Sequence, residues 1–157
     1  MSVAVRTPTA PLRGLLGYAM GTDHKSVAVR TFCTAFGFFI AGGVLAMLMR
    51  TELAQPGMQL TSRAGYDQLF TMHGSTMIYF FVTPVALSLG TYLVPLQVGA
   101  AEIAAPRLNL VGFWLFVLGG VIAWSGFLTR NGAGAAAWTA EFPQSGSTGT
   151  PGEGMDL

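Results

Sequence analysis

Charged side chains and cysteine are scarce in this sequence. Only 10% of its 157 residues are charged, against about 25% in an ordinary soluble domain. Together with a hydrophobic content of 52%, that scarcity excludes a disordered chain and a typical cytosolic enzyme. A net charge of +1 is too small for a surface that binds nucleic acid. The single cysteine, Cys33, excludes an internal disulfide framework and a metal cluster held by cysteines alone.

Long apolar runs are abundant instead. Three of them are long enough to cross the roughly 30 Å hydrocarbon core of a bilayer, namely Val27–Met49, Leu69–Leu96 and Leu108–Leu128. The 21 glycines also suit close packing between membrane helices. The sequence therefore predicts an all-α integral membrane protein with three transmembrane helices.

Basic residues predict the orientation of these helices. Five of the eight fall on the N-terminal side of the membrane, which favours a cytoplasmic N-terminus: Arg6, Arg13, Lys25, Arg30 and Arg107. The expected organisation is then a cytoplasmic tail at 1–22, a membrane region at 23–128 and an extracytoplasmic loop at 129–157. We expect that loop to stop before a fourth span.

Three residues predict details of helix packing. Gly42 forms a small-x-x-x-small pair with Ala46, and such pairs let two membrane helices approach closely. Pro84 lies inside the second run and removes a backbone hydrogen bond there, so we expect a kink. Arg30 lies near the start of the first run, and we expect its side chain to reach the membrane interface.

His73 is the most informative polar residue, because it lies about one helical turn inside the second run. An ionisable group at that depth is a functional candidate, and neutral imidazole is a common metal ligand. The alternative is a packed histidine bonded to a neighbouring helix. Arg50 is expected near the same membrane face, although from position alone an interface anchor is the favoured interpretation. His24 belongs to the opposite face, about 30 Å away, and so cannot be a second ligand beside His73.

Polar residues around the connection between the second and third apolar runs form another candidate site. A carboxylate at Glu102 could collect protons, and Asn109 and Thr91 could hold water in a path. From position alone the favoured alternative is a solvated loop acid at Glu102 and a helix N-cap at Asn109.

From about residue 22 to 157 the sequence resembles the N-terminal part of subunit I of the haem–copper cytochrome c oxidases. Several separate motifs occur in the family's order, which makes the resemblance specific. These motifs are Asp23–Lys25 (DHK), Met49–Gly57 (MRTELAQPG), Phe70–Gly74 (FTMHG), Pro95–Ala100 (PLQVGA), Ala105–Asn109 (APRLN) and Phe113–Leu115 (FWL).

The resemblance implies a role for each matching residue. His73 matches the axial ligand of the low-spin haem, and Arg50 matches the arginine that bonds the formyl group of haem a. Glu102 stands where the family has the aspartate at the mouth of the proton path called the D-channel. Asn109 matches an asparagine that lines this path, and Thr91 stands where another asparagine is usual.

The resemblance also implies the activity of a larger assembly. That assembly would be a respiratory terminal oxidase, which reduces O2 to water with electrons from cytochrome c, or a bound c-type domain, and translocates protons. This chain would be the first part of a twelve-helix subunit I. The second haem, copper B and the second axial histidine of the low-spin haem are expected beyond Leu157, so residues 1–157 alone are expected to be inactive. Expected partners are the rest of subunit I, other oxidase subunits and membrane lipid. The expected location is a bacterial inner membrane, with the mitochondrial inner membrane as the second choice.

The sequence also departs from the family. Glu102 lengthens the arm of the expected aspartate, and Thr91 changes the hydrogen-bond donors of the path. Near Trp138, the segment Glu141–Gln144 replaces a usual Tyr-Pro-Pro-Leu, which predicts an altered outer loop. Two alternatives stay open: a truncated or split non-catalytic membrane subunit, and a small transporter that uses Glu102 and His73 in its path.

Overall fold

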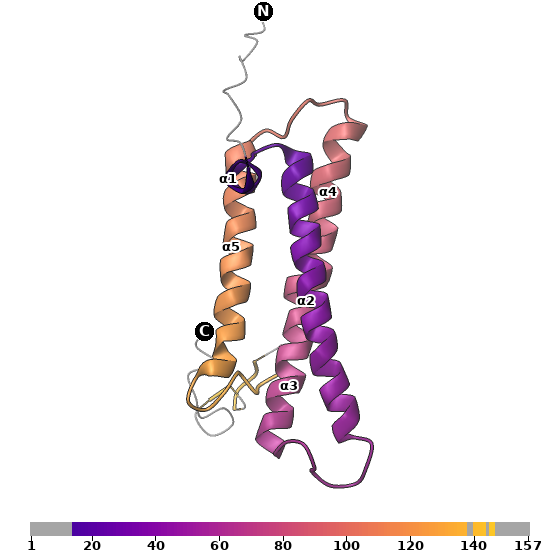
Figure 1. Cartoon of the computed structure of the whole chain (residues 1–157), viewed down its shortest axis with the longest axis vertical. Coiled ribbons are helices and arrows are strands. Elements are labelled where there is room, and N and C mark those ends of the chain that lie inside the picture. Colours follow the sequence, from indigo (N-terminus) through magenta and orange to yellow (C-terminus); the bar gives the residue numbers. More distant parts are fainter. Residues whose placement is uncertain (1–13, 138–139, 144, 147–157) are drawn as a thin grey trace, which may run out of the picture.

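The computed structural model describes residues 14–137, 140–143 and 145–146 (Figure 1). Its helices are α1 (Leu15–Met20), α2 (His24–Glu52), α3 (Arg63–Ser75), η1 (Thr76–Val82), α4 (Thr83–Gln97), α5 (Pro106–Ser125) and η2 (Gly126–Leu128). The segments α3, η1 and α4 follow one another without a break, and η2 directly continues α5.

Three helical stretches are long and apolar enough to cross a membrane, and they match the three predicted runs. They cover His24–Glu52, Arg63–Gln97 and Pro106–Leu128, each slightly longer than its predicted run. The all-α class and the three spans are therefore confirmed. Of the predicted tail, residues 1–13 lie outside the described residues, and α1 lies within the remainder. No helix occurs in the described part of 129–157.

Local capping explains why the helices begin beyond the apolar runs. The Asp23 carboxylate accepts the backbone N–H of Ser26 at 3.0 Å and so caps α2. The Ser62 hydroxyl accepts the N–H of Gly65 at 3.1 Å and caps α3. Pro106 occupies the first turn of α5, where its missing N–H costs no helical hydrogen bond. Each cap satisfies donors that a helix start leaves unpaired.

Pro84 disturbs the second span, as predicted, but the disturbance takes the form of a π-helix. The seven residues of η1 directly precede the turn that contains Pro84. The N–H of Thr83 bonds the carbonyl of Ile78, five residues earlier. A proline in a regular α-helix clashes with the carbonyl four residues before it, and the wider π turn places that strain ahead of α4.

Gly42 lets α2 approach the second span closely, which confirms the packing predicted for this glycine. A side chain at position 42 would meet Met77 Sδ at 3.0 Å and Thr76 Cγ2 at 3.3 Å. Both neighbours belong to η1, and Thr76 is fully buried. A side chain at position 42 would have to displace these neighbours by a few tenths of an ångström, so glycine suits the point where the two helices cross.

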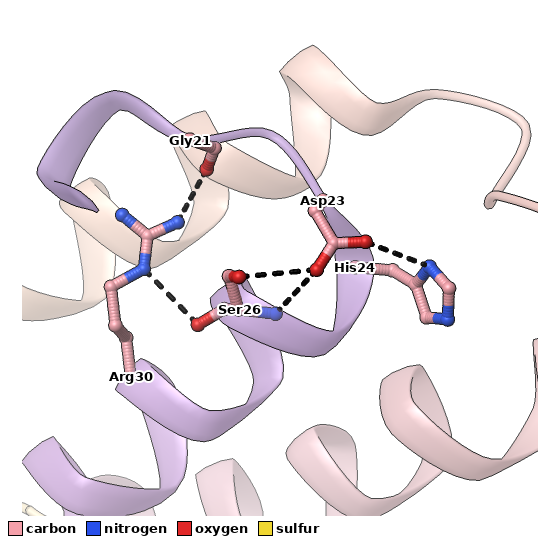
Figure 2. A network of polar contacts seen from close by, with 5 residues as sticks. All are labelled: Gly21, Asp23, His24, Ser26 and Arg30. Atoms are coloured by element: carbon pink, nitrogen blue, oxygen red, sulfur yellow. Dashed lines mark hydrogen bonds and ion pairs between the residues drawn. The ribbon is translucent and has the colours of Figure 1, made fainter. Parts of the chain in front are cut away.

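The side chain of Arg30 is buried against residues that precede α2, and its place relative to the membrane interface stays a prediction. It is 5% exposed, and its guanidinium stacks over the rings of Tyr18 and Phe113. Its N–H groups donate to the backbone carbonyls of Gly21 and Ser26 (Figure 2). They also donate to the carbonyls of Tyr18 and Ala19. The last carbonyls of a helix lack partners, so the end of α1 supplies acceptors that sequence patterning does not show.

Three phenylalanines join the three spans near the middle of the bundle. The ring of Phe38 lies 5.1 Å from that of Phe80 and 5.8 Å from that of Phe116, between ring centroids. Gly120 of α5 is buried directly against the Phe38 ring. The contact leaves no room for a methyl group at position 120.

We expect Gly120→Ala to destabilise the folded chain by about 1–3 kcal/mol, a usual cost of overpacking. The added Cβ overlaps the ring of Phe38, which is itself held by two other rings. Thermal unfolding in detergent, followed by circular dichroism, measures the effect. Gly119→Ala is the matched control, because nothing lies within 4 Å of that position. Adding Phe38→Leu to Gly120→Ala should recover part of the loss, and equal stability of the two alanine variants would contradict this packing.

Candidate functional site

His73 lies in the last turn of α3 and is bonded to α2 through one ring nitrogen. Its Nδ1 lies 2.9 Å from the carbonyl oxygen of Gly42. Because a carbonyl only accepts, Nδ1 carries the hydrogen of this bond, and in the neutral imidazole Nε2 then keeps its lone pair. Among the described residues Nε2 makes no hydrogen bond. The alternative of a histidine packed on a neighbouring helix therefore accounts for Nδ1 alone.

This arrangement fits the chemistry of an axial haem ligand. Histidines that bind metals commonly donate the second ring N–H to a carbonyl, which fixes the tautomer and the ring orientation. No group of three His, Cys, Asp or Glu residues able to hold a metal ion occurs in the described chain. A metal bound at His73 would thus take its remaining ligands from a cofactor or from another part of the protein.

The loop after α5 packs beside the turn that carries His73. The backbone N–H of Ala137 donates to Thr71 Oγ1 at 2.8 Å, and Gln68 donates to the carbonyl of Asn131 at 2.9 Å. Met72 is buried in one cluster with Leu45 of α2 and Ala133 of the loop. The end of α3 is therefore fixed from two sides. Gln144 of the segment predicted to be altered, and Trp138 before that segment, lie outside the described residues.

Arg50 lies at the same end of the bundle as His73, but the structure does not bring the two side chains into contact. It is exposed in the last turn of α2, eight residues beyond Gly42, or about 12 Å along the helix. There its charge complements the negative end of the α2 dipole. In the described chain it forms no ion pair. Both residues lie at one end of the bundle, and a shared membrane face and a role toward a cofactor stay predictions.

Glu52 is a residue of this region that sequence analysis missed. Its side chain is 1% exposed and accepts three backbone N–H groups at 2.7–3.0 Å, those of Gln59, Leu60 and Thr61. The carboxylate therefore folds the loop at 53–62 back over the end of α2. The available sequence signal for this buried carboxylate was a glutamate in the last helical turn, followed by the turn residues Pro56 and Gly57.

Two of the three residues in the second candidate group line a cavity of about 540 Å³ between α2, α4 and α5. Thr91 and Asn109, which come from different helices, both line it, with further hydroxyls from Thr31, Thr83 and Ser88. Asn109 Nδ2 is buried without a hydrogen-bond partner. A cavity of this size with several polar groups can hold water.

Of the alternative that position alone favoured, the structure agrees with the part on Glu102 and contradicts the part on Asn109. Glu102 is indeed exposed, in the bend between α4 and α5, but its neighbour Ile103 lines the cavity. The N-cap of α5 is Ala105. Assigning that cap to Asn109 is therefore wrong, because its side chain lines the cavity instead.

His24 is separated from His73, as the sequence predicted. It is the first residue of α2, whereas His73 bonds Gly42, eighteen residues further along the same helix, or about 27 Å at 1.5 Å per residue. The two histidines cannot ligate one metal ion within this chain.

Comparison with known proteins agrees with this architecture. Residues 26–156 match the family described as Cytochrome C and Quinol oxidase polypeptide I. The chain is 48% identical over 145 residues to a putative cytochrome c oxidase subunit 1-beta of Streptomyces coelicolor, covering 92% of this chain and 25% of that protein. It is 48% identical over 136 residues to a probable subunit 1-beta of Nocardia farcinica, covering 87% and 23%.

A third relative, cytochrome c oxidase subunit 1 of Corynebacterium efficiens, is 44% identical over 136 residues, which cover 87% of this chain and 23% of that protein. The chain thus spans about a quarter of the length of the curated relatives it matches. The match nevertheless covers all three membrane spans in one continuous region. The chain therefore belongs to the cytochrome c and quinol oxidase polypeptide I family.

Proposed function

We propose that this chain is the N-terminal segment of the catalytic subunit of a respiratory terminal oxidase, which reduces O2 to water with electrons from cytochrome c. The observation that carries the proposal is the bond between His73 Nδ1 and the Gly42 carbonyl. It leaves Nε2 available in a segment long and apolar enough to span a membrane. The names of the relatives support the same activity.

His73 and Arg50 would hold a low-spin haem, which we assign as haem a. When bound, that haem supplies one-electron transfer. The Gly42 carbonyl orients the imidazole and increases its basicity, and Arg50 would place a positive charge toward the formyl group. The other three quarters of the subunit would supply the second axial ligand and would hold the second haem and copper B. Residues 1–157 alone would therefore be inactive.

Protons would enter through the cavity between α2, α4 and α5. Glu102 would collect them at the mouth, and Thr91 and Asn109 would bind water inside. The unpartnered amide of Asn109 supports this role, because a buried donor without a partner costs free energy that water would recover. The mouth would face the cytoplasm of a bacterial cell, together with the N-terminus, in the inner membrane.

Purification of the native assembly tests the proposal. An antibody against the exposed segment at 53–60 should capture a complex with other oxidase subunits from source membranes. We expect a reduced-minus-oxidised haem spectrum and oxygen consumption supported by reduced cytochrome c. A captured chain without haem would contradict the proposal, and would favour a non-catalytic subunit or, if it moves ions, a transporter.

A further inference from the structure

A second, smaller groove of about 200 Å³ lies between α2 and α4. It is lined by Ala28, Val29, Phe32, Ser88, Leu89 and Tyr92. Of these residues, Ser88 alone also lines the larger cavity, and its hydroxyl already donates to the carbonyl of Val85 at 2.8 Å. Apart from the phenol of Tyr92, the other side chains are apolar, so the groove suits an apolar occupant.

The depth of this groove corresponds to the place where the acyl chains of a bilayer begin. The 29 residues of α2 extend about 44 Å, which is the thickness of a bilayer with both headgroup layers. Ala28 and Phe32 lie about 6 and 12 Å beyond the helix start, and one headgroup layer is about 5–8 Å thick. The end of α4 lies beside the start of α2 (Figure 1), so Tyr92 lies near the same membrane face, where tyrosine is enriched.

A positive charge lies at the headgroup end of the groove. Lys25 is exposed and lies one turn before Ala28 and Val29 on the same face of α2, just outside the groove. In the described chain it forms no ion pair. The nearby Asp23 carboxylate accepts the N–H and the hydroxyl of Ser26 (Figure 2), and residues two apart on a helix do not face each other. The Lys25 ammonium is therefore available to an anion from outside the chain.

We propose that this groove binds an anionic phospholipid, with one acyl chain between α2 and α4 and the phosphate at Lys25. Burial of the chain supplies affinity, and the lysine selects a negative headgroup. Tyr92 makes no hydrogen bond in the described chain, and a phenol at this depth supplies a donor to lipid oxygens. A side chain from another membrane helix would fill the groove but would leave both polar groups unpartnered. This lipid site is independent of the proposed haem and proton path.

Photoreactive lipids added to the purified native complex test the site. Phosphatidylglycerol with a photoreactive acyl chain should label residues 28–32 and 88–92, as mapped by peptide mass spectrometry at a lipid concentration below saturation. We expect Lys25→Gln to lower this labelling about fivefold, the effect of one lysine near an anionic headgroup. Labelling by the phosphatidylcholine analogue should not change. Arg107→Gln is the matched control, because Arg107 is exposed at the same end of the bundle and does not line the groove.

A second pair of variants tests the groove itself. Val29→Trp should fill it and lower labelling by both lipids about tenfold, whereas Val44→Trp should change neither. Both valines are exposed on α2, by 45% and 55%, so neither substitution crowds the core. The haem spectrum should stay normal in every variant, which separates this test from that of the proposed function. Equal labelling of the two tryptophan variants, or no label at 28–32 and 88–92 because another helix covers the groove, would overturn the proposal.

Discussion

Replacing His73 with alanine should abolish the low-spin haem signal of the complete oxidase. Among the described residues of this region, the imidazole alone combines a hydrogen-bonded Nδ1 with an Nε2 that makes no hydrogen bond, and haem iron takes such a ligand. Alanine removes both the iron ligand and the bond to the Gly42 carbonyl. Optical and electron paramagnetic resonance spectra of purified enzyme measure the loss. Electron transfer from cytochrome c should fall to background in the same preparation.

The second histidine of the chain provides the control for this prediction. His24→Ala removes an imidazole about 27 Å away along α2 and should leave the haem spectrum unchanged. Comparable yields of the two variants would show that loss of haem in His73→Ala is not a failure to assemble. A low-spin spectrum in His73→Ala identical to that of the unaltered enzyme would refute the assignment.

The three spans were predictable because a bilayer imposes one strong requirement on sequence. Backbone polar groups must be satisfied within the segment, so a long apolar run has few options besides a helix. The helix ends were less predictable, since Asp23 and Ser62 extend α2 and α3 into polar sequence through capping. The π-helix before Pro84 was missed because a proline predicts a disturbance without specifying how the backbone absorbs it.

Contacts between distant residues set the limit of sequence reasoning about the site. His73 was identifiable from its depth, but its partner Gly42 is 31 residues away and depends on the register between two helices. The partners of Arg30 and Glu52 were missed for a related reason. Each residue is buried on backbone groups of a neighbouring segment. The convergence of Thr91 and Asn109 on one cavity likewise appears only in three dimensions.

Replacing Glu102 with glutamine should slow proton uptake by the complete oxidase on the order of tenfold or more, while both the haem spectrum and assembly stay normal. Glutamine has nearly the same shape but cannot exchange a proton near neutral pH. The carboxylate lies in the bend between α4 and α5, next to cavity-lining Ile103. Because the side chain is exposed and unpaired in the described chain, its loss should leave stability almost unchanged. Uptake is measured with a pH-sensitive dye and enzyme in vesicles.

Two further variants separate a proton collector from a nonspecific surface charge. Glu102→Asp keeps the carboxylate on a shorter arm and should retain most of the uptake rate. Glu141→Gln removes another exposed glutamate, from the segment after α5, and should have no effect. Asn109→Leu places an apolar side chain inside the cavity and should slow uptake even with Glu102 intact. Glu102→Gln removes the proton collector, and Asn109→Leu removes a polar group that lines the cavity. Normal proton uptake in both variants would therefore show that protons reach the enzyme by a route outside this cavity.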